Sequence, residues 1–86
     1  MKYTVYIIRS TKTGQYYIGM TKNLAKRLKA HNKNSGRFTK NKGKWELVYK
    51  EELPDKRSAW LREKQIKRYK GGESFKQLLR RGGRVD

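Results

Sequence analysis

The sequence predicts one small α/β (α+β) domain, in which a three-stranded antiparallel sheet is flanked by helices in the order ββαβαα. Short runs rich in β-branched and aromatic residues alternate with stretches in which apolar residues recur at helical spacing. The chain has 86 residues and no cysteine, so one core must hold it together by packing alone. We expect the domain to span residues 1–81, followed by a flexible tail over residues 82–86.

Three segments have the composition of strands. Residues 3–8 (YTVYII) and 16–19 (YYIG) are separated by a polar stretch that contains a glycine, which predicts a β-hairpin. Residues 45–51 (WELVYKE) repeat the strand pattern, and Pro54 ends it because proline cannot donate to a sheet hydrogen bond.

Three helices are predicted from the apolar periodicity. The first covers residues 22–32, with Thr21 as its candidate N-cap. The second covers residues 56–70 and ends at a glycine pair, and a short third helix covers residues 73–80. The apolar positions that define these helices are Leu24, Leu28, Ala59, Trp60, Ile66, Phe75, Leu78 and Leu79.

The charge of the chain predicts a polyanionic partner. Lysine and arginine number 24 against 7 acidic residues, giving a formal net charge of +17, and the scarcity of acidic residues argues against a merely solvated basic face. Nucleic acid fits this charge better than an anionic membrane surface does. Residues 34–44 (NSGRFTKNKGK) read as a basic loop that could follow a phosphate backbone. The candidate nucleic-acid-binding residues are Lys22, Lys26, Arg37, Lys40, Lys42 and Lys44.

The composition also bears on order and location. The mean hydropathy of −1.17 approaches the disordered range, but two Trp, six Tyr and two Phe supply large side chains that favour a folded domain. No apolar run approaches the roughly 18 residues that indicate a membrane span. Met1 leads directly into an alternating segment and not into a signal peptide, so we expect a cytoplasmic location and no membrane partner.

Glu63 is the candidate metal ligand. It lies four residues after Ala59 and three before Ile66, on the stripe of the second helix that faces the protein. Cations flank it, so its position alone favours an ion-pairing surface residue. Hydrolysis of a phosphodiester by a metal would require a hard cation, which prefers carboxylate oxygen.

Four further residues could take part in phosphate chemistry. Arg27 and His31 lie one turn apart on the first helix, where arginine can bind phosphate and histidine can move a proton. Tyr6 and Tyr17 fall on the same face of the hairpin. Taken singly, each is also compatible with packing or capping. A phenol with a reference pKa of about 10 is a poor base at neutral pH, and we expect the surrounding cations to lower its pKa.

Together these residues resemble a known family. The segment Thr4-Val5-Tyr6, followed by Tyr17-Ile18-Gly19 and then by Arg27, His31 and Glu63, closely resembles the GIY-YIG endonuclease domain. The match covers nearly the whole chain and is similar to the short stand-alone branch, which is related to the N-terminal nuclease domain of the repair excinuclease. Each residue is weakly specific by itself, but all of them in this order are a strong signal.

The resemblance implies a metal-dependent endonuclease that hydrolyses DNA phosphodiester bonds, with a role in DNA repair or recombination. Tyr6 and Tyr17 would flank the scissile phosphate, and either could handle the proton of the attacking water. Arg27 would stabilise the negative charge of the transition state, and His31 would carry a proton or contact phosphate. Glu63 would hold one divalent metal ion, Mg²⁺ or Mn²⁺. Gly19 would permit a close approach of the backbone at the site.

The sequence departs from the family pattern at three points, and two other functions stay open. Thr4 replaces the first glycine of the motif, Met20 stands where some relatives have lysine, and no asparagine follows Glu63. A non-catalytic nucleic-acid-binding module would use the same tyrosines for stacking or packing. A structural RNA-binding protein would suit the charge but would leave Glu63 unexplained. Substrate preference and oligomeric state are not predicted by the sequence.

Overall fold

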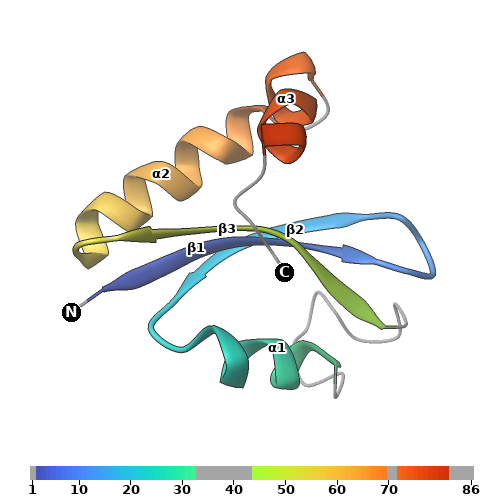
Figure 1. The fold of residues 1–86 in the computed structure, drawn as a ribbon, viewed down its shortest axis with the longest axis horizontal. Coiled ribbons are helices and arrows are strands. Elements are labelled where there is room, and N and C mark those ends of the chain that lie inside the picture. The colour runs from blue at the N-terminus through green and yellow to red at the C-terminus, as the bar shows by residue number, and fades with distance from the viewer. Residues whose placement is uncertain (1, 33–43, 70–71, 82–86) are drawn as a thin grey trace.

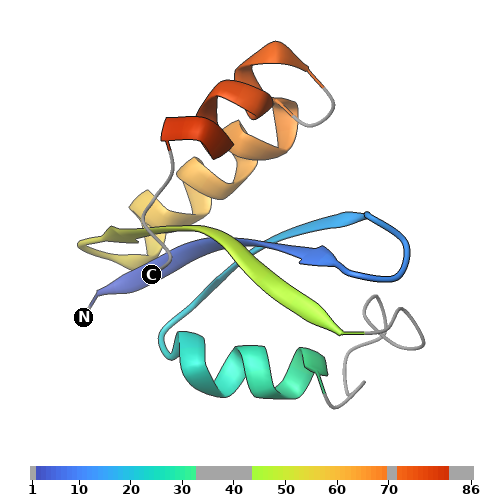
Figure 2. The same cartoon turned by 45° about the vertical axis from the view of Figure 1, so that its right-hand side comes forward.

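The order of strands and helices is the predicted ββαβαα. The computed structural model describes residues 2–32, 44–69 and 72–81. The elements are β1 (Tyr3–Ser10), β2 (Tyr16–Thr21), α1 (Leu24–Asn32), β3 (Trp45–Leu53), α2 (Lys56–Tyr69) and α3 (Glu73–Arg81). The strands form one antiparallel sheet in the order β2-β1-β3, which confirms the predicted fold class. Helix α1 covers one face of the sheet, and α2 and α3 lie on the other (Figures 1 and 2).

The central strand β1 supplies the core on both faces of the sheet. Its side chains alternate between the faces, so Val5 and Ile7 pack toward α2 while Tyr6 and Ile8 pack toward α1. All of these are at most 1% exposed, because helices cover both faces of the central strand. The cluster on the α2 face comprises Val5, Ile7, Ile18, Tyr49, Ala59, Ile66 and Phe75. The cluster on the α1 face comprises Tyr6, Ile8 and Trp45, with Tyr17, Leu24, Leu28 and Leu47 packed against it.

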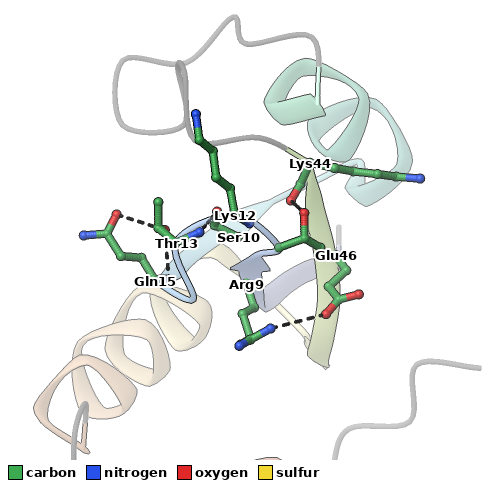
Figure 3. A network of polar contacts seen from close by, with 8 residues as sticks. Arg9, Ser10, Lys12, Thr13, Gln15, Lys44 and Glu46 are labelled. Atoms are coloured by element: carbon green, nitrogen blue, oxygen red, sulfur yellow. Dashed lines mark hydrogen bonds and ion pairs between the residues drawn. The ribbon is translucent and has the colours of Figure 1, made fainter.

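Polar contacts close the hairpin between β1 and β2 (Figure 3). Ser10 is buried, and its Oγ accepts hydrogen bonds from the backbone N–H groups of Lys12 at 3.2 Å and Thr13 at 3.0 Å. Gly14 completes the turn with a φ of 76°, a left-handed conformation that glycine adopts without steric cost. Both hairpin strands are longer than predicted. The ladder continues past Ile8, where Arg9 pairs with Tyr16, and past Gly19, where Met20 and Thr21 pair with Val5 and Thr4.

The start of α1 corrects the prediction. The helix begins at Leu24 and not at residue 22, and its N-cap is Asn23, whose Oδ1 accepts a hydrogen bond from the Lys26 N–H at 3.1 Å. Thr21 is the last residue of β2, where it pairs with Thr4 in the sheet. Both residues are good caps by type, and the sheet pairing decides between them.

Helix α2 differs from the prediction at one apolar position. It begins after Asp55, whose carboxylate accepts a hydrogen bond from the Ser58 N–H at 2.7 Å as an N-cap. Ala59 and Ile66 are fully buried as expected, but Trp60 is 48% exposed. A helix turns by about 100° per residue, so the residue after Ala59 points away from the sheet.

Three predictions concern segments that lie outside the described residues. These are the basic loop except for Lys44, the end of the second helix at residue 70, and the tail over residues 82–86. Within the described ranges, none of the helices has the length and apolar character needed to cross a membrane.

Candidate active site

Tyr6 occupies the centre of the candidate site, between β1 and α1. Its side chain is 1% exposed, and its hydroxyl oxygen lies 3.0 Å from His31 Nε2. The Arg27 guanidinium, one turn before His31 on α1, also hydrogen-bonds to the Tyr6 oxygen. The buried phenol therefore contacts both predicted residues of α1.

Tyr17 completes the group from the neighbouring strand. The pairs Tyr6–Gly19 and Ile8–Tyr17 in the β1–β2 register put both tyrosines on the α1 face, as the hairpin pattern predicted. The Tyr17 ring centroid lies 5.0 Å from that of His31 and 6.3 Å from that of Tyr6. Arg27 hydrogen-bonds to Tyr17 as well as to Tyr6. The fold thus brings Tyr6, Tyr17, Arg27 and His31 together.

Burial sets the protonation state of Tyr6 and His31. It raises the pKa of the Tyr6 phenol above its ordinary value of 10.0, and this outweighs the lowering by the Arg27 hydrogen bond and charge. The expectation that surrounding cations lower the phenol pKa is therefore wrong for Tyr6. Burial, and secondarily the charge of Arg27, lowers the pKa of His31 below 6.5. Both side chains are uncharged at neutral pH.

The contact between Tyr6 and His31 depends on the tautomer of the histidine. Arginine has only donors, so the Tyr6 oxygen accepts from Arg27. In the tautomer whose Nε2 carries no proton, His31 Nε2 accepts the phenol O–H at 3.0 Å; in the other tautomer, Nε2 donates to the second lone pair of the phenol oxygen. The first tautomer provides Tyr6 with an acceptor for its proton.

Glu63 comes from the other layer of the fold. It lies on α2, across the sheet from α1, and its side chain is 16% exposed. Its carboxylate Oε2 forms an ion pair with Lys67 Nζ at 2.7 Å, one turn further along the helix. Its negative charge helps to raise the pKa of Tyr6, but less than burial and the Tyr17 charge do. Glu63 therefore interacts electrostatically with Tyr6, although it lies on the other side of the sheet.

Glu63 has the right chemistry for a metal ligand. No group of three or more His, Cys, Asp or Glu side chains that could hold a metal occurs among residues 2–32, 44–69 and 72–81. Mg²⁺ often uses only one or two carboxylates, with water and substrate phosphate as the other ligands, so a single carboxylate fits. The Lys67 side chain is 54% exposed, so it can move away from the Glu63 carboxylate at little cost.

Gly19 is required by the position of Tyr6. A Cβ atom at residue 19 would lie 2.7 Å from the Tyr6 hydroxyl oxygen and 2.8 Å from its Cζ. The phenol end of Tyr6 thus occupies the space above the backbone of its cross-strand partner. The glycine lets this ring reach His31.

Gly19→Ala should displace the Tyr6 ring and lower the stability of the fold by about 1–3 kcal/mol, because the buried ring has little room to move. Urea denaturation measures the loss of stability, and near-ultraviolet circular dichroism reports the changed packing of the aromatic rings. Gly14→Ala is the control. It costs about 1–2 kcal/mol through its left-handed φ, but it leaves Tyr6 in place and should keep the wild-type near-ultraviolet spectrum. A fully stable Gly19→Ala protein with an unchanged spectrum would contradict this role of the glycine.

The predicted nucleic-acid-binding lysines and arginine divide into three groups. Lys22 and Lys26 are exposed and, beside Arg27, line a hollow of about 340 Å³ at the start of α1. Lys44 is exposed at the start of β3, where its backbone carbonyl accepts a hydrogen bond from Thr11 Oγ1 at 2.9 Å. The remaining candidates, Arg37, Lys40 and Lys42, lie outside the described residues.

The sequence reasoning missed one contact that holds the site together. Asn32, directly after His31, accepts a hydrogen bond from the Trp45 N–H to its Oδ1 at 2.7 Å. The bond ties the end of α1 to the start of β3, and the Trp45 ring is buried in the same cluster as Tyr6. No spacing rule links two residues so far apart in the chain, so only the folded structure reveals this contact.

Comparison with known proteins agrees with the geometry. The sequence model of the GIY-YIG catalytic domain matches residues 2–76. A UPF0213 protein of Clostridium perfringens is 45% identical over 65 residues, which cover 74% of this chain and 69% of the relative. A UPF0213 protein of Staphylococcus saprophyticus is 34% identical over 76 residues, which cover 87% of this chain and 92% of the relative. The solution NMR structure of a UPF0213 protein from Bacillus halodurans has a TM-score of 0.61 and 30% identity, covering 96% of this chain and 87% of that one.

Proposed function

The chain belongs to the GIY-YIG nuclease family, in its UPF0213 branch, and from this we propose that it is an endonuclease that hydrolyses DNA phosphodiester bonds. The observation that carries the proposal is the meeting of Tyr6, Tyr17, Arg27 and His31 on one face of the sheet. A role in DNA repair or recombination and a cytoplasmic location belong to the same proposal.

Arg27 is the group that stabilises charge on the phosphate. Its guanidinium has five N–H donors, and its bonds to Tyr6 and Tyr17 hold it beside both phenols. The negative charge on the phosphorus oxygens grows as water attacks, so a fixed cation there binds the transition state more tightly than the substrate. The exposure of Arg27 on α1 leaves it accessible to a polyanion.

Tyr6 is the residue we assign to the proton of the attacking water. Its raised pKa rules out a standing phenolate at neutral pH, so it must release its own proton as it takes one from water. His31 Nε2, at 3.0 Å, accepts that proton. Tyr17 and Arg27 would then orient the phosphate beside the Tyr6 hydroxyl.

Glu63 is the residue that would hold one divalent metal ion, Mg²⁺ or Mn²⁺. When bound, the metal would polarise the phosphate oxygens and neutralise part of their charge. The chain's own contribution is a partly buried carboxylate whose charge already reaches the Tyr6 phenol. One protein ligand suffices only if substrate phosphate and water complete the coordination, so the proposal predicts tighter metal binding in the presence of nucleic acid.

A non-catalytic nucleic-acid-binding module is the second candidate. It is favoured by the absence of an asparagine after Glu63 in the sequence. Both functions predict affinity that falls steeply with salt, because bound lysines and arginines displace counterions from the phosphates. Strand cleavage and specific metal binding separate them, since only the nuclease requires both.

The test is a cleavage assay on labelled plasmid, duplex, single-stranded and branched DNA, with Mg²⁺ or Mn²⁺ and with EDTA. We expect metal-dependent cutting of at least one DNA that stops in EDTA. Matching RNA substrates test whether DNA is the preferred ligand. A structural RNA-binding protein would bind the RNA substrates more tightly and would cut neither RNA nor DNA. Binding to all substrates without cutting any would reject the nuclease in favour of the non-catalytic module.

A further inference from the structure

Helix α2 has one flank that is anchored to the sheet. Arg62 Nε donates to Glu51 Oε1 on β3 at 2.8 Å, and Arg62 Nη1 donates to Gln65 Oε1 at 2.9 Å. Gln65 Nε2 donates in turn to the Tyr69 hydroxyl at 2.8 Å. The polar side chains on this flank therefore hydrogen-bond within the protein. The bond from Arg62 to Glu51 ties this flank of the helix to β3.

The opposite flank of α2 exposes an aromatic ring among cations. Trp60 is 48% exposed, although Lys64 Nζ lies 4.2 Å from its ring centroid. Lys56, Lys64 and Lys67 are exposed and lie four residues before, four after and seven after Trp60, on the same side of the helix. Glu63 lies three residues after Trp60, and its side chain is 16% exposed. Residues three apart are neighbours on a helix surface, so the helical spacing places the aromatic ring beside the candidate metal ligand.

We propose that Trp60, with Lys64 and Lys67, forms a subsite that stacks one unpaired nucleobase of the substrate beside Glu63. The proposal rests on the proposed function and adds a substrate class to it. Every base has an aromatic face, so a tryptophan binds unpaired nucleotides without regard to sequence. The two lysines supply charge for the phosphates on either side of that base. Bases stacked inside an intact duplex cannot reach such a ring, so the subsite favours single-stranded or branched DNA.

The charge of α2 favours nucleic acid over a second copy of the chain on this flank. The helix carries six lysine and arginine residues and one acidic residue, Glu63. Two such flanks would repel each other, since the whole chain has a formal net charge of +17. A polynucleotide, by contrast, offers both complementary charge and aromatic surface.

The experiment uses Trp60 as its own reporter, in EDTA so that no substrate is cut. The chain has two tryptophans, and Trp45 is 1% exposed, so stacking of a base should quench the fluorescence of Trp60 alone. Titration with oligothymidylate should quench the wild-type protein, whereas Trp60→Phe should lose the quenching because only Trp45 remains. Absence of quenching in the wild-type protein would overturn the subsite.

Affinity gives the second readout. By fluorescence anisotropy, Trp60→Ala should weaken binding of labelled oligothymidylate about 10-fold and binding of a duplex of equal length far less, while Trp60→Phe retains most of the affinity. Leu61→Ala is the matched control, since Leu61 is the neighbouring residue and is 51% exposed, yet it lacks an aromatic ring. Circular dichroism confirms that each variant is folded, as expected for exposed positions.

The outcomes distinguish this proposal from the nuclease proposal. Unchanged oligothymidylate affinity in Trp60→Ala would overturn the subsite, even if the protein cuts DNA. Self-association that disappears in Trp60→Ala, with DNA binding unchanged, would also overturn it and would assign the flank to a second copy. If the protein needs Trp60 to bind oligothymidylate but cuts no substrate, the stacking subsite is supported and the nuclease proposal is rejected.

Discussion

Replacing Glu63 with alanine is expected to reduce DNA cleavage by at least ~10²-fold, because it removes the carboxylate proposed to hold the metal. Nucleic-acid affinity should persist, since the substitution removes a negative charge from a strongly basic surface. The fold should persist too. The Glu63–Lys67 ion pair spans one helical turn, and such pairs contribute only about 0.3–0.5 kcal/mol.

Glu46 provides the matched control for Glu63. It is also a glutamate paired with a cation, with its carboxylate 3.8 Å from Arg9, but it lies on β3 near the hairpin turn and its side chain is 54% exposed (Figure 3). Glu46→Ala should cut DNA like the wild-type protein. Retention of full cleavage by Glu63→Ala would refute the metal site, whereas equal losses in both variants would point to a general effect of charge.

Replacing Tyr6 with phenylalanine is expected to lower the cleavage rate by at least ~10²-fold, because it removes the hydroxyl proposed to pass the proton of the attacking water to His31. The ring keeps its place in the core, so the variant should fold. Its stability should fall by about 1–3 kcal/mol, since the buried His31 nitrogen loses its phenol partner. Single-turnover cleavage and urea denaturation measure the two effects.

Two further tyrosine variants show whether a loss of cleavage is specific to the Tyr6 hydroxyl. Tyr49→Phe removes a hydroxyl from the same sheet, but this hydroxyl bonds to Glu51 at 3.2 Å and its ring lies in the cluster on the α2 face. It should cleave normally. Tyr17→Phe should lose less activity than Tyr6→Phe if Tyr17 only orients phosphate. An active Tyr6→Phe beside an inactive Tyr17→Phe would transfer the proton role to Tyr17.

Local patterns in the sequence predicted the elements and several of the site residues. Alternation in residues 3–8 and the turn that follows placed Tyr6 and Tyr17 on one face of the hairpin. Helical spacing placed Arg27 and His31 on one side of α1, and both contact Tyr6. These predictions succeeded because strand and helix periods depend only on near neighbours in the chain. The predicted cap of α1, Thr21, is wrong because Thr21 pairs with Thr4 in the sheet, and a pairing between distant segments leaves no local pattern in the sequence.

The sequence by itself determined the strongly positive charge of the chain, the ββαβαα order and the identity of the residues that resemble the family motif. Only the tertiary structure decided that Trp60 is exposed and that Glu63 lies across the sheet from α1. It also decided that the pKa of Tyr6 rises, because burial is a property of packing, and the desolvation of a phenol between β1 and α1 outweighs the charge of Arg27. Periodicity shows which way a side chain points, but its burial and partners depend on the elements packed against it.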